Sequence, residues 1–260
     1  MTKMLAIANQ KGGVGKTTTT VNLAASLATK QRRVLLIDLD PQGNATMGSG
    51  IDKRDLQASV YDVLLGNKSV AASRARAEAG QYDVLPANRD LAGAEVELVG
   101  LPHREMRLRN ALESVAPEYD HVIIDCPPAL NLLTINGLCA AKSVMIPMQC
   151  EYYALEGLSD LVNTIRKVRA NLNPDLEIEG LLRTMFDPRN TLAQQVSDQL
   201  QQHFGNKVYR TVVPRNVRLA EAPSYGLPVL YHDKSSKGAQ AYLDLADELL
   251  ANAAHATAKT

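Results

Sequence analysis

The chain alternates short runs of aliphatic and β-branched residues with longer segments in which apolar residues recur at helical spacing. Most of the short runs are apolar throughout, which is typical of parallel strands covered on both faces. We therefore predict seven strands: MLAIA (4–8), RVLLID (33–38), YDVLP (82–86), HVIID (121–125), SVMIPM (143–148), IEGLLRT (178–184) and KVYRTVV (207–213).

Helical periodicity occupies segments between these runs. Leu192, Val196 and Leu200 follow a possible capping box of Thr191 and Gln194. An earlier set with helical spacing comprises Leu158, Leu161, Val162, Ile165, Val168 and Leu172. Strands that alternate with helices predict an α/β fold with a doubly wound, mostly parallel sheet, helices on both faces and right-handed crossovers. In such a sheet a ligand binds at the carboxyl ends of the strands.

A single domain accounts for the whole pattern, because no internal repeat or long linker divides it. We predict that this domain covers residues 1–250 and that residues 251–260, ANAAHATAKT, form a short flexible tail. The stretch from Gly43 to Asn67 is rich in Gly, Asp and Ser. It predicts an irregular, mobile insertion.

Composition excludes few function classes. Lys plus Arg equals Asp plus Glu, 28 each in 260 residues, so the net charge indicates no polyanionic partner and any nucleic-acid surface has to be a local patch. No apolar run reaches the roughly 18 residues of a membrane span, and no signal-peptide pattern precedes Met4. Cys126, Cys139 and Cys150 are widely spaced in apolar surroundings, which favours buried thiols over a metal site. We expect a cytoplasmic protein.

The segment NQKGGVGKTTTT (9–20) follows the first predicted strand and leads into a helix expected to start near Lys16. It ends as a phosphate-binding loop does, but Gln10 stands where the first glycine belongs and Lys11 is additional. Lys16 is expected to reach the β- and γ-phosphates, and the Thr17 hydroxyl to ligate Mg²⁺. The backbone N–H groups that can converge on phosphate oxygens belong to Gly12, Gly13, Val14, Gly15, Lys16, Thr17 and Thr18. The sequence predicts a P-loop NTPase-like site.

Acidic side chains end two of the predicted strands. Asp125 in HVIIDCPP can hold Mg²⁺ through water. Asp38 and Asp40 in RVLLIDLDPQGN are two residues apart, so both could point to one side, toward the phosphates. Asp40 is the better candidate to orient an attacking water, whereas Asp38 is as well suited to a supporting role as to a direct one.

Three motifs, KGGVGKTT, DLDPQGNAT and IIDCPP, together resemble those of the deviant Walker A ATPases, and most closely those of the ParA/Soj chromosome-partitioning proteins. The resemblance continues through TMFDPRN (184–190) and VPRNVRLAEAPSYGLPV (213–229). It implies Mg²⁺-dependent hydrolysis of ATP to ADP and phosphate, slow without a stimulating partner.

The resemblance also implies roles for individual residues. The extra lysine, here Lys11, is expected to reach the partner subunit's nucleotide phosphates, so that the ATP-bound state is a homodimer. Lys11, Lys16 and Asp40 form the implied catalytic set. Pro214 and Asn216 are expected to lie against the adenine base.

The segment from Arg183 to Lys237 holds eight basic and four acidic residues, a local net charge of +4 in a chain whose total is zero. Such a bias is typical of surfaces that meet phosphate backbones. The resemblance implies nonspecific binding of double-stranded DNA through Arg189, Arg215, Arg218 and Lys234. No aromatic ladder or helix-turn-helix accompanies them, which argues against single-strand stacking and sequence-specific binding.

Alternatives remain open at this stage. A MinD-like ATPase would hold a membrane through a basic amphipathic last helix, but AQAYLDLADELLANAA carries three acidic and no basic residues. A metabolic enzyme of the same superfamily and a nucleotide-binding scaffold that never hydrolyses are the others. We predict a ParA-type ATPase that segregates a chromosome or plasmid. It coats the nucleoid as an ATP-bound dimer and is released by a ParB-type partner.

Overall fold

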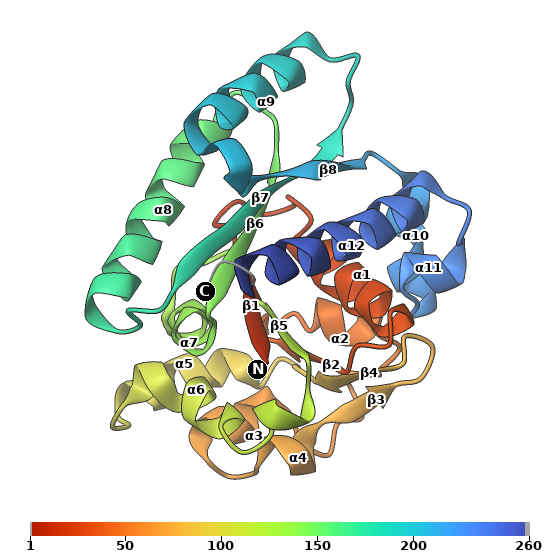
Figure 1. The fold of residues 1–260 in the computed structure, drawn as a ribbon. Coiled ribbons are helices and arrows are strands. Elements are labelled where there is room, and N and C mark those ends of the chain that lie inside the picture. The colour runs from red at the N-terminus through yellow and green to blue at the C-terminus, as the bar shows by residue number, and fades with distance from the viewer. Residues whose placement is uncertain (1, 258–260) are drawn as a thin grey trace.

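The computed structural model describes the backbone of residues 2–257 and the side chains of residues 2–254. Within this range one eight-stranded sheet has the order β3-β4-β2-β5-β1-β6-β7-β8 (Figure 1). Neighbouring strands are parallel, except β3 and β4. The strands are β1 (Lys3–Ile7), β2 (Val34–Asp38), β3 (Ala75–Ala77), β4 (Tyr82–Leu85), β5 (His121–Asp125), β6 (Ser143–Gln149), β7 (Glu177–Phe186) and β8 (Val208–Pro214). The seven predicted strands are confirmed.

Helices cover both faces of the sheet (Figure 1). On one face α1 (Lys16–Thr29) and α12 (Lys237–Thr257) pack on each other and on strand residues such as Leu5 and Ile7. The other face carries α3 (Val60–Leu65), α5 (Leu91–Val99), α6 (Arg107–Leu112), α7 (Leu132–Ala140), α8 (Ala154–Asn171) and α9 (Thr191–Phe204). The shorter helices are α2 (Asn44–Gly48), α4 (Val70–Ser73), α10 (Val217–Glu221) and α11 (Val229–His232). The predicted doubly wound, P-loop NTPase-like fold is confirmed.

The strand ends that matter for function lie side by side in the middle of the sheet. In the register, Asp125 at the end of β5 stands opposite Ile7 at the end of β1 and Asp38 at the end of β2. The loops that follow β1, β2 and β5 therefore leave the sheet at one level. This alignment brings the glycine-rich loop and both acidic motifs together, as expected for a ligand site at the carboxyl edge.

The stretch from Gly43 to Asn67 is more regular than the sequence predicts. It contains α2 and α3, and turns and bends connect them over residues 49–59. Ala45, Val60 and Leu64 are fully buried, and the side chain of Ser59 caps α3 in a capping box with Asp62. Gly, Asp and Ser in this stretch serve as helix caps and turns, which composition alone does not distinguish from a loop.

Two helix ends also differ from the prediction. The N-cap of α9 is Asn190, whose side chain accepts a hydrogen bond from Ala193 N, so Thr191 and Gln194 form no capping box. Helix α12 continues to Thr257, through the first seven residues of the expected tail, and residues 258–260 lie outside the described residues. Among the described residues, no helix is both long enough and apolar enough to cross a membrane.

Candidate nucleotide site

A cavity of about 600 Å³ opens at the carboxyl edge of the sheet. Its walls come from the glycine-rich loop, the segments after β2 and β5, the ends of β7 and β8, and α12, which are far apart in the sequence. All predicted nucleotide-binding residues line it except Lys11 and Val14, and Asp40 lines it as well. A volume of this size is in the range of small-molecule sites.

The glycine-rich loop connects β1 to α1 and has the backbone that a phosphate cradle needs. Gly13 has φ 74° and Gly15, the N-cap of α1, has φ 88°. Both values lie in the left-handed region, which side chains other than glycine rarely adopt. No atom lies within 4 Å of where a Cβ at Gly12 or Gly13 would stand, so the loop faces open space. A bound phosphate can approach the N–H groups and the N-terminus of α1.

Thr184, at the end of β7, holds this loop in place, although the sequence analysis gave it no role. Its hydroxyl donates a hydrogen bond of 2.8 Å to the carbonyl of Val14, which is buried beneath the loop. The motif TMFDPRN contained this residue, but no periodicity pointed to a contact with a segment 170 residues away.

Lys16 is buried at the base of the cavity, and its Nζ donates a 3.0 Å hydrogen bond to the carbonyl of Lys11. Burial lowers the pKa of the Lys16 ammonium, against the opposing charges of Asp125 and Asp40. The side chain thus lies where the phosphates were predicted to bind.

Asp125 and Thr17 are brought together as predicted. The Thr17 hydroxyl donates to Asp125 Oδ2 at 2.7 Å, and the Thr20 hydroxyl donates to Asp125 Oδ1 at 2.9 Å. Burial, reinforced by the nearby Asp38 carboxyl, raises the pKa of Asp125. Thr17 lines the cavity and fully buried Asp125 does not. A hydroxyl backed by a carboxylate is an oxygen donor set that fits Mg²⁺, with Asp125 one shell farther out.

The two acidic residues of the β2 motif have different environments. Fully buried Asp38 accepts hydrogen bonds from Asp40 N, Thr46 N and the Thr46 hydroxyl, and burial raises its pKa to about 6. Asp38 is absent from the cavity wall, whereas half-buried Asp40 lines it. Asp38 therefore supports the turn that carries Asp40. The two residues do not share a face of one strand, because β2 ends at Asp38 and Asp40 lies beyond it.

The side chain of Lys11 does not line the cavity. Its Nζ lies 2.5 Å from Glu151 Oε2, in an ion pair whose two side chains are about half exposed. Glu151 follows β6 and was not singled out in the sequence. The side chain of Lys11 therefore stands at the surface beside the cavity mouth.

Pro214 and Asn216 line the cavity, together with Met185 and Tyr242. Asn216 Oδ1 caps α10 by accepting from Arg218 N and Leu219 N, which leaves its amide nitrogen outside the cap. Tyr242, on α12, bonds through its hydroxyl to Thr19 on α1 at 3.1 Å. Sequence analysis missed Met185 and Tyr242, because neither belongs to a motif that names a ligand.

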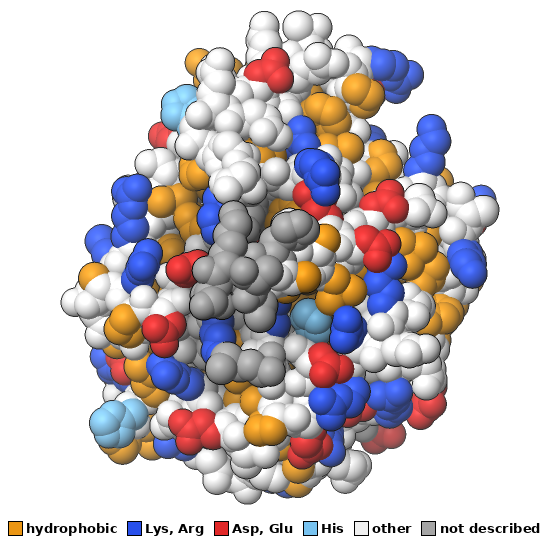
Figure 2. Space-filling view, in the orientation of Figure 1, with side chains coloured by type: hydrophobic (Ala, Val, Ile, Leu, Met, Phe, Trp, Pro, Cys, Tyr) orange, Lys and Arg blue, Asp and Glu red, His pale blue; other side chains and the backbone are white. Residues whose placement is uncertain are grey.

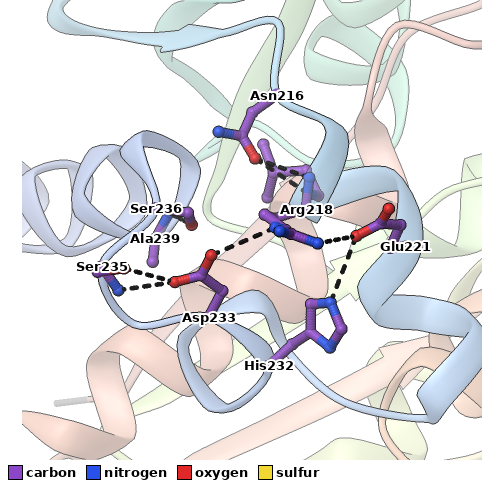
Figure 3. Close-up of polar contacts among 9 residues, drawn as sticks. Asn216, Arg218, Glu221, His232, Asp233, Ser235, Ser236 and Ala239 are labelled. Carbon is purple, nitrogen blue, oxygen red and sulfur yellow. Dashed lines mark hydrogen bonds and ion pairs between the residues drawn. The ribbon is translucent and has the colours of Figure 1, made fainter.

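Arg218 of the predicted DNA-binding set lies between two acidic side chains (Figure 3). Its Nη1 is 2.7 Å from Glu221 Oε2 and its Nε is 3.3 Å from Asp233 Oδ2. His232 Nε2 is 3.6 Å from the same Glu221 oxygen, and its ring stacks on Tyr225. Arg218 is absent from the cavity wall although its neighbours Val217 and Leu219 line it.

The other basic residues of this region differ in exposure and in their partners. Arg189 is exposed and bound to Asp187 through Nε and Nη2, and Arg215 is close enough to lower the pKa of Asp187 further. Arg215 and Lys234 are exposed. Arg183 points inward and donates to Ser197 Oγ and the Tyr209 carbonyl, so it should not be counted in the basic surface. Figure 2 shows Lys and Arg interspersed with Asp and Glu on the face that it displays.

The three cysteines are free thiols and are buried, as predicted. Burial raises the pKa of Cys126, and a Cβ at Gly137 would stand 2.9 Å from its sulfur. Cys126 therefore packs between β5 and α7 as a small apolar side chain.

Comparison with known proteins gives consistent matches along the chain. A family model described as an AAA domain matches residues 2–178. The sporulation initiation inhibitor protein Soj of Bacillus subtilis is 57% identical over 97% of this chain and 100% of its own. The chromosome partitioning protein ParA of Myxococcus xanthus is 53% identical over 95% and 88%. A structure from Mycobacterium smegmatis, named cobyrinic acid a,c-diamide synthase with bound ATP analogue and magnesium, is 42% identical, with a TM-score of 0.85 over 96% and 95% of the two chains.

Proposed function

Because the chain belongs to the ParA/Soj family of chromosome-partitioning ATPases, we propose that ATP converts it into a homodimer that holds double-stranded DNA without sequence preference. A ParB-type partner then stimulates hydrolysis, and the dimer separates and leaves the DNA. The observation that carries this proposal is the pair of signature lysines, since Lys16 lies inside the cavity while Lys11 stands outside it beside the mouth.

The cavity supports ATP as the nucleotide and Mg²⁺ as its ion. The loop N–H groups and Lys16 would hold the phosphates, and Pro214 and Asn216, which line the same cavity, would hold the base. Thr17 would hold Mg²⁺ directly and Asp125 through water, and the ion would neutralise charge on the phosphates. Asp40 would orient the attacking water, since its carboxylate lies at the cavity wall.

The exposed position of Lys11 supports a role across a dimer. A cation at the rim adds little to phosphate binding within its own subunit, because its side chain turns to Glu151. When two cavity mouths face each other, each Lys11 can approach the other subunit's nucleotide. The γ-phosphate then favours the dimer and its loss favours the monomer.

The basic region supports a DNA-binding face on which arginines are paired with carboxylates when no DNA is bound. Arg189 and Arg218 are neutralised by Asp187, Glu221 and Asp233. Exposed ion pairs of this kind contribute little free energy, so a phosphate can replace the carboxylates. A dimer doubles the number of cations presented, which would make DNA binding depend on ATP.

Burial of the last helix argues against the membrane alternative. In α12, Tyr242, Leu245 and Leu249 are buried against α1 and the sheet, so its apolar side is already used inside the fold. A lipid-binding helix needs a free apolar side and a basic polar side. We propose that the protein acts in the cytoplasm on the nucleoid, and that the single ATPase domain predicted over residues 1–250 extends through α12.

A metabolic activity is the second candidate, because the M. smegmatis structure carries the name of a metabolic enzyme. Binding to a nonspecific DNA duplex separates the two. It would be measured with ATP, with ADP and without nucleotide, from about 50 to about 200 mM salt. We expect binding with ATP alone, with log affinity falling linearly with log salt concentration. ATP-dependent dimers that bind no DNA in any state would contradict partitioning and favour the metabolic candidate.

A further inference from the structure

A second cavity, of about 700 Å³, lies at the amino edge of the sheet, and it shares no lining residue with the nucleotide site. In the register, Lys3 at the start of β1 and Val34 at the start of β2 both stand beside His121 at the start of β5. The start of β1 and the last turns of α12 border this cavity (Figure 1). Its volume is in the range of small-molecule sites.

His121 lies in the wall of this cavity with its ring almost completely buried. The residue is 6% exposed, and its side chain forms no hydrogen bond or ion pair with another residue that the structure describes. Burial, together with the charges of Lys3 and Arg32, lowers the pKa of His121 to about 4, so the ring is neutral at neutral pH. A neutral imidazole offers one N–H donor and one acceptor. Because buried polar groups are nearly always hydrogen-bonded, this ring indicates a place for a ligand.

Three cationic side chains line the same cavity. Lys3 Nζ is 2.7 Å from Glu179 Oε1, and Arg33 donates to both carboxylate oxygens of Asp120. Arg32 is exposed and has no such partner in the described part of the chain. Three cations against two carboxylates leave one positive charge in excess, and partly exposed ion pairs contribute little free energy. The cavity therefore favours an anion.

The rest of the wall is apolar. Pro117 lies on one side, and Leu250 on α12 lies on another. Tyr119 adds its ring, while its hydroxyl is already used as a donor to Asp83 Oδ2 at 2.7 Å. An anionic group can thus lie among the cations with an apolar group beside it.

We propose that this cavity binds a small phosphate monoester, with the phosphate at Lys3, Arg32 and His121 and the apolar part of the molecule against Pro117 and Leu250. A phosphate monoester carries about −1.5 to −2 charge at neutral pH and three acceptor oxygens, which suits several cations and an imidazole N–H. A carboxylate offers one charge and two oxygens. The inference is independent of the proposed function, because it uses no residue of the nucleotide site.

The probe for this site is phenyl phosphate, added to nitrogen-15-labelled protein that is already saturated with ADP and Mg²⁺, so that the nucleotide site is occupied. The NMR signals of the His121 ring, identified by their loss in His121→Gln, report binding locally. We expect a saturable shift of these signals with phenyl phosphate and none with phenol. Arg32→Ala should raise the dissociation constant by roughly tenfold or more, as for a hydrogen bond to a charged group.

Arg166→Ala is the matched control, because it removes the same charge from an exposed position on α8 outside this cavity and should leave the dissociation constant unchanged. His121 signals that do not move with phenyl phosphate would overturn the proposal. Equal weakening by Arg32→Ala and Arg166→Ala would also overturn it, since general charge attraction would then explain the binding. A short DNA duplex that moves these signals when phenyl phosphate does not would assign this edge to a polynucleotide. None of these results depends on whether ATP causes dimerisation or DNA binding.

Discussion

The Nζ of Lys16 donates a hydrogen bond of 3.0 Å to the backbone carbonyl of Lys11. The two lysines that distinguish the loop are therefore one structural unit, in which the buried side chain of one supports the backbone of the other. The ammonium that would bind phosphate is held in the cavity by the loop itself. Phosphate oxygens offer stronger acceptors than a carbonyl, so nucleotide binding can draw on this contact.

Lys16→Ala should lose ATP binding and dimerisation together. Hydrogen bonds to charged groups contribute about 1.5–3 kcal/mol each, so ATP affinity should fall by roughly tenfold to a hundredfold or more. Fluorescent-nucleotide titration measures the affinity, with Lys167→Ala on the exposed side of α8 as the control. Retained tight ATP binding would contradict the assignment of the site.

Lys11→Ala should keep monomeric ATP affinity within about threefold, because the side chain is absent from the cavity wall. The ATP-dependent dimer should be lost, since the cation that acts in trans is removed. Light scattering with ATP measures the mass, and ADP supplies the monomeric reference. An unchanged dimer would rule out the role in trans.

Asp40→Ala should leave a persistent ATP-bound dimer on DNA. The carboxylate lies at the cavity wall and accepts a hydrogen bond from Gln42 N, so its removal takes away the group that orients water while the loop glycines and Lys16 remain. Phosphate release with partner and DNA should fall by about 100-fold or more, a typical range for a positioned acid–base group. Normal stimulated turnover in this variant would remove Asp40 from the hydrolytic step.

Glu221→Gln should strengthen DNA binding in the ATP state by a few fold at low salt, because it frees the Arg218 guanidinium from a 2.7 Å ion pair. Asp244→Asn is the control, since it removes the same charge from an exposed position on α12 that contacts Gln240. Arg218→Ala should reduce the salt slope by about one. Equal gains from Glu221→Gln and Asp244→Asn would show that total charge alone matters.

Stability should depend on pH through His121, which is buried at the start of β5. Burial lowers its pKa to about 4, helped by Lys3 and Arg32 and opposed by Asp120 and Glu179. An unfolded histidine has a pKa of about 6.5, so the unfolded state binds more protons below that value.

The free energy of unfolding should therefore fall as pH drops from about 6.5 to about 4, by at most about 1.4 kcal/mol per pH unit from this residue. His121→Gln should remove that part of the slope in urea titrations, whereas His203→Gln on the exposed side of α9 should not. The same slope in both variants would exclude His121 as the cause.

The local pattern of apolar residues was enough to predict most of the strands. The strands β2, β5 and β6 are buried along almost their whole length, and such strands need little more than an uninterrupted apolar sequence, whereas β7 and β8 include partly exposed residues. The strand β3 escaped prediction because Ala75–Ala77 is three residues long and lies at the sheet edge. Asn190 was missed as the N-cap of α9 because the next residue, Thr191, is also a common N-cap residue, and the sequence pattern does not distinguish the two.

By itself, the sequence determined the fold class, the glycine-rich loop before α1, and the meeting of Thr17 with Asp125 at one edge of the sheet. All of these depend on motifs at strand ends that a parallel sheet must bring to one edge. Only the tertiary structure decided that Asp38 supports Asp40, that Thr184 holds the loop, and that Lys11 turns to Glu151. These contacts depend on the order of the strands in the sheet and on the direction of each side chain. The spacing of residues in the sequence predicts neither of these.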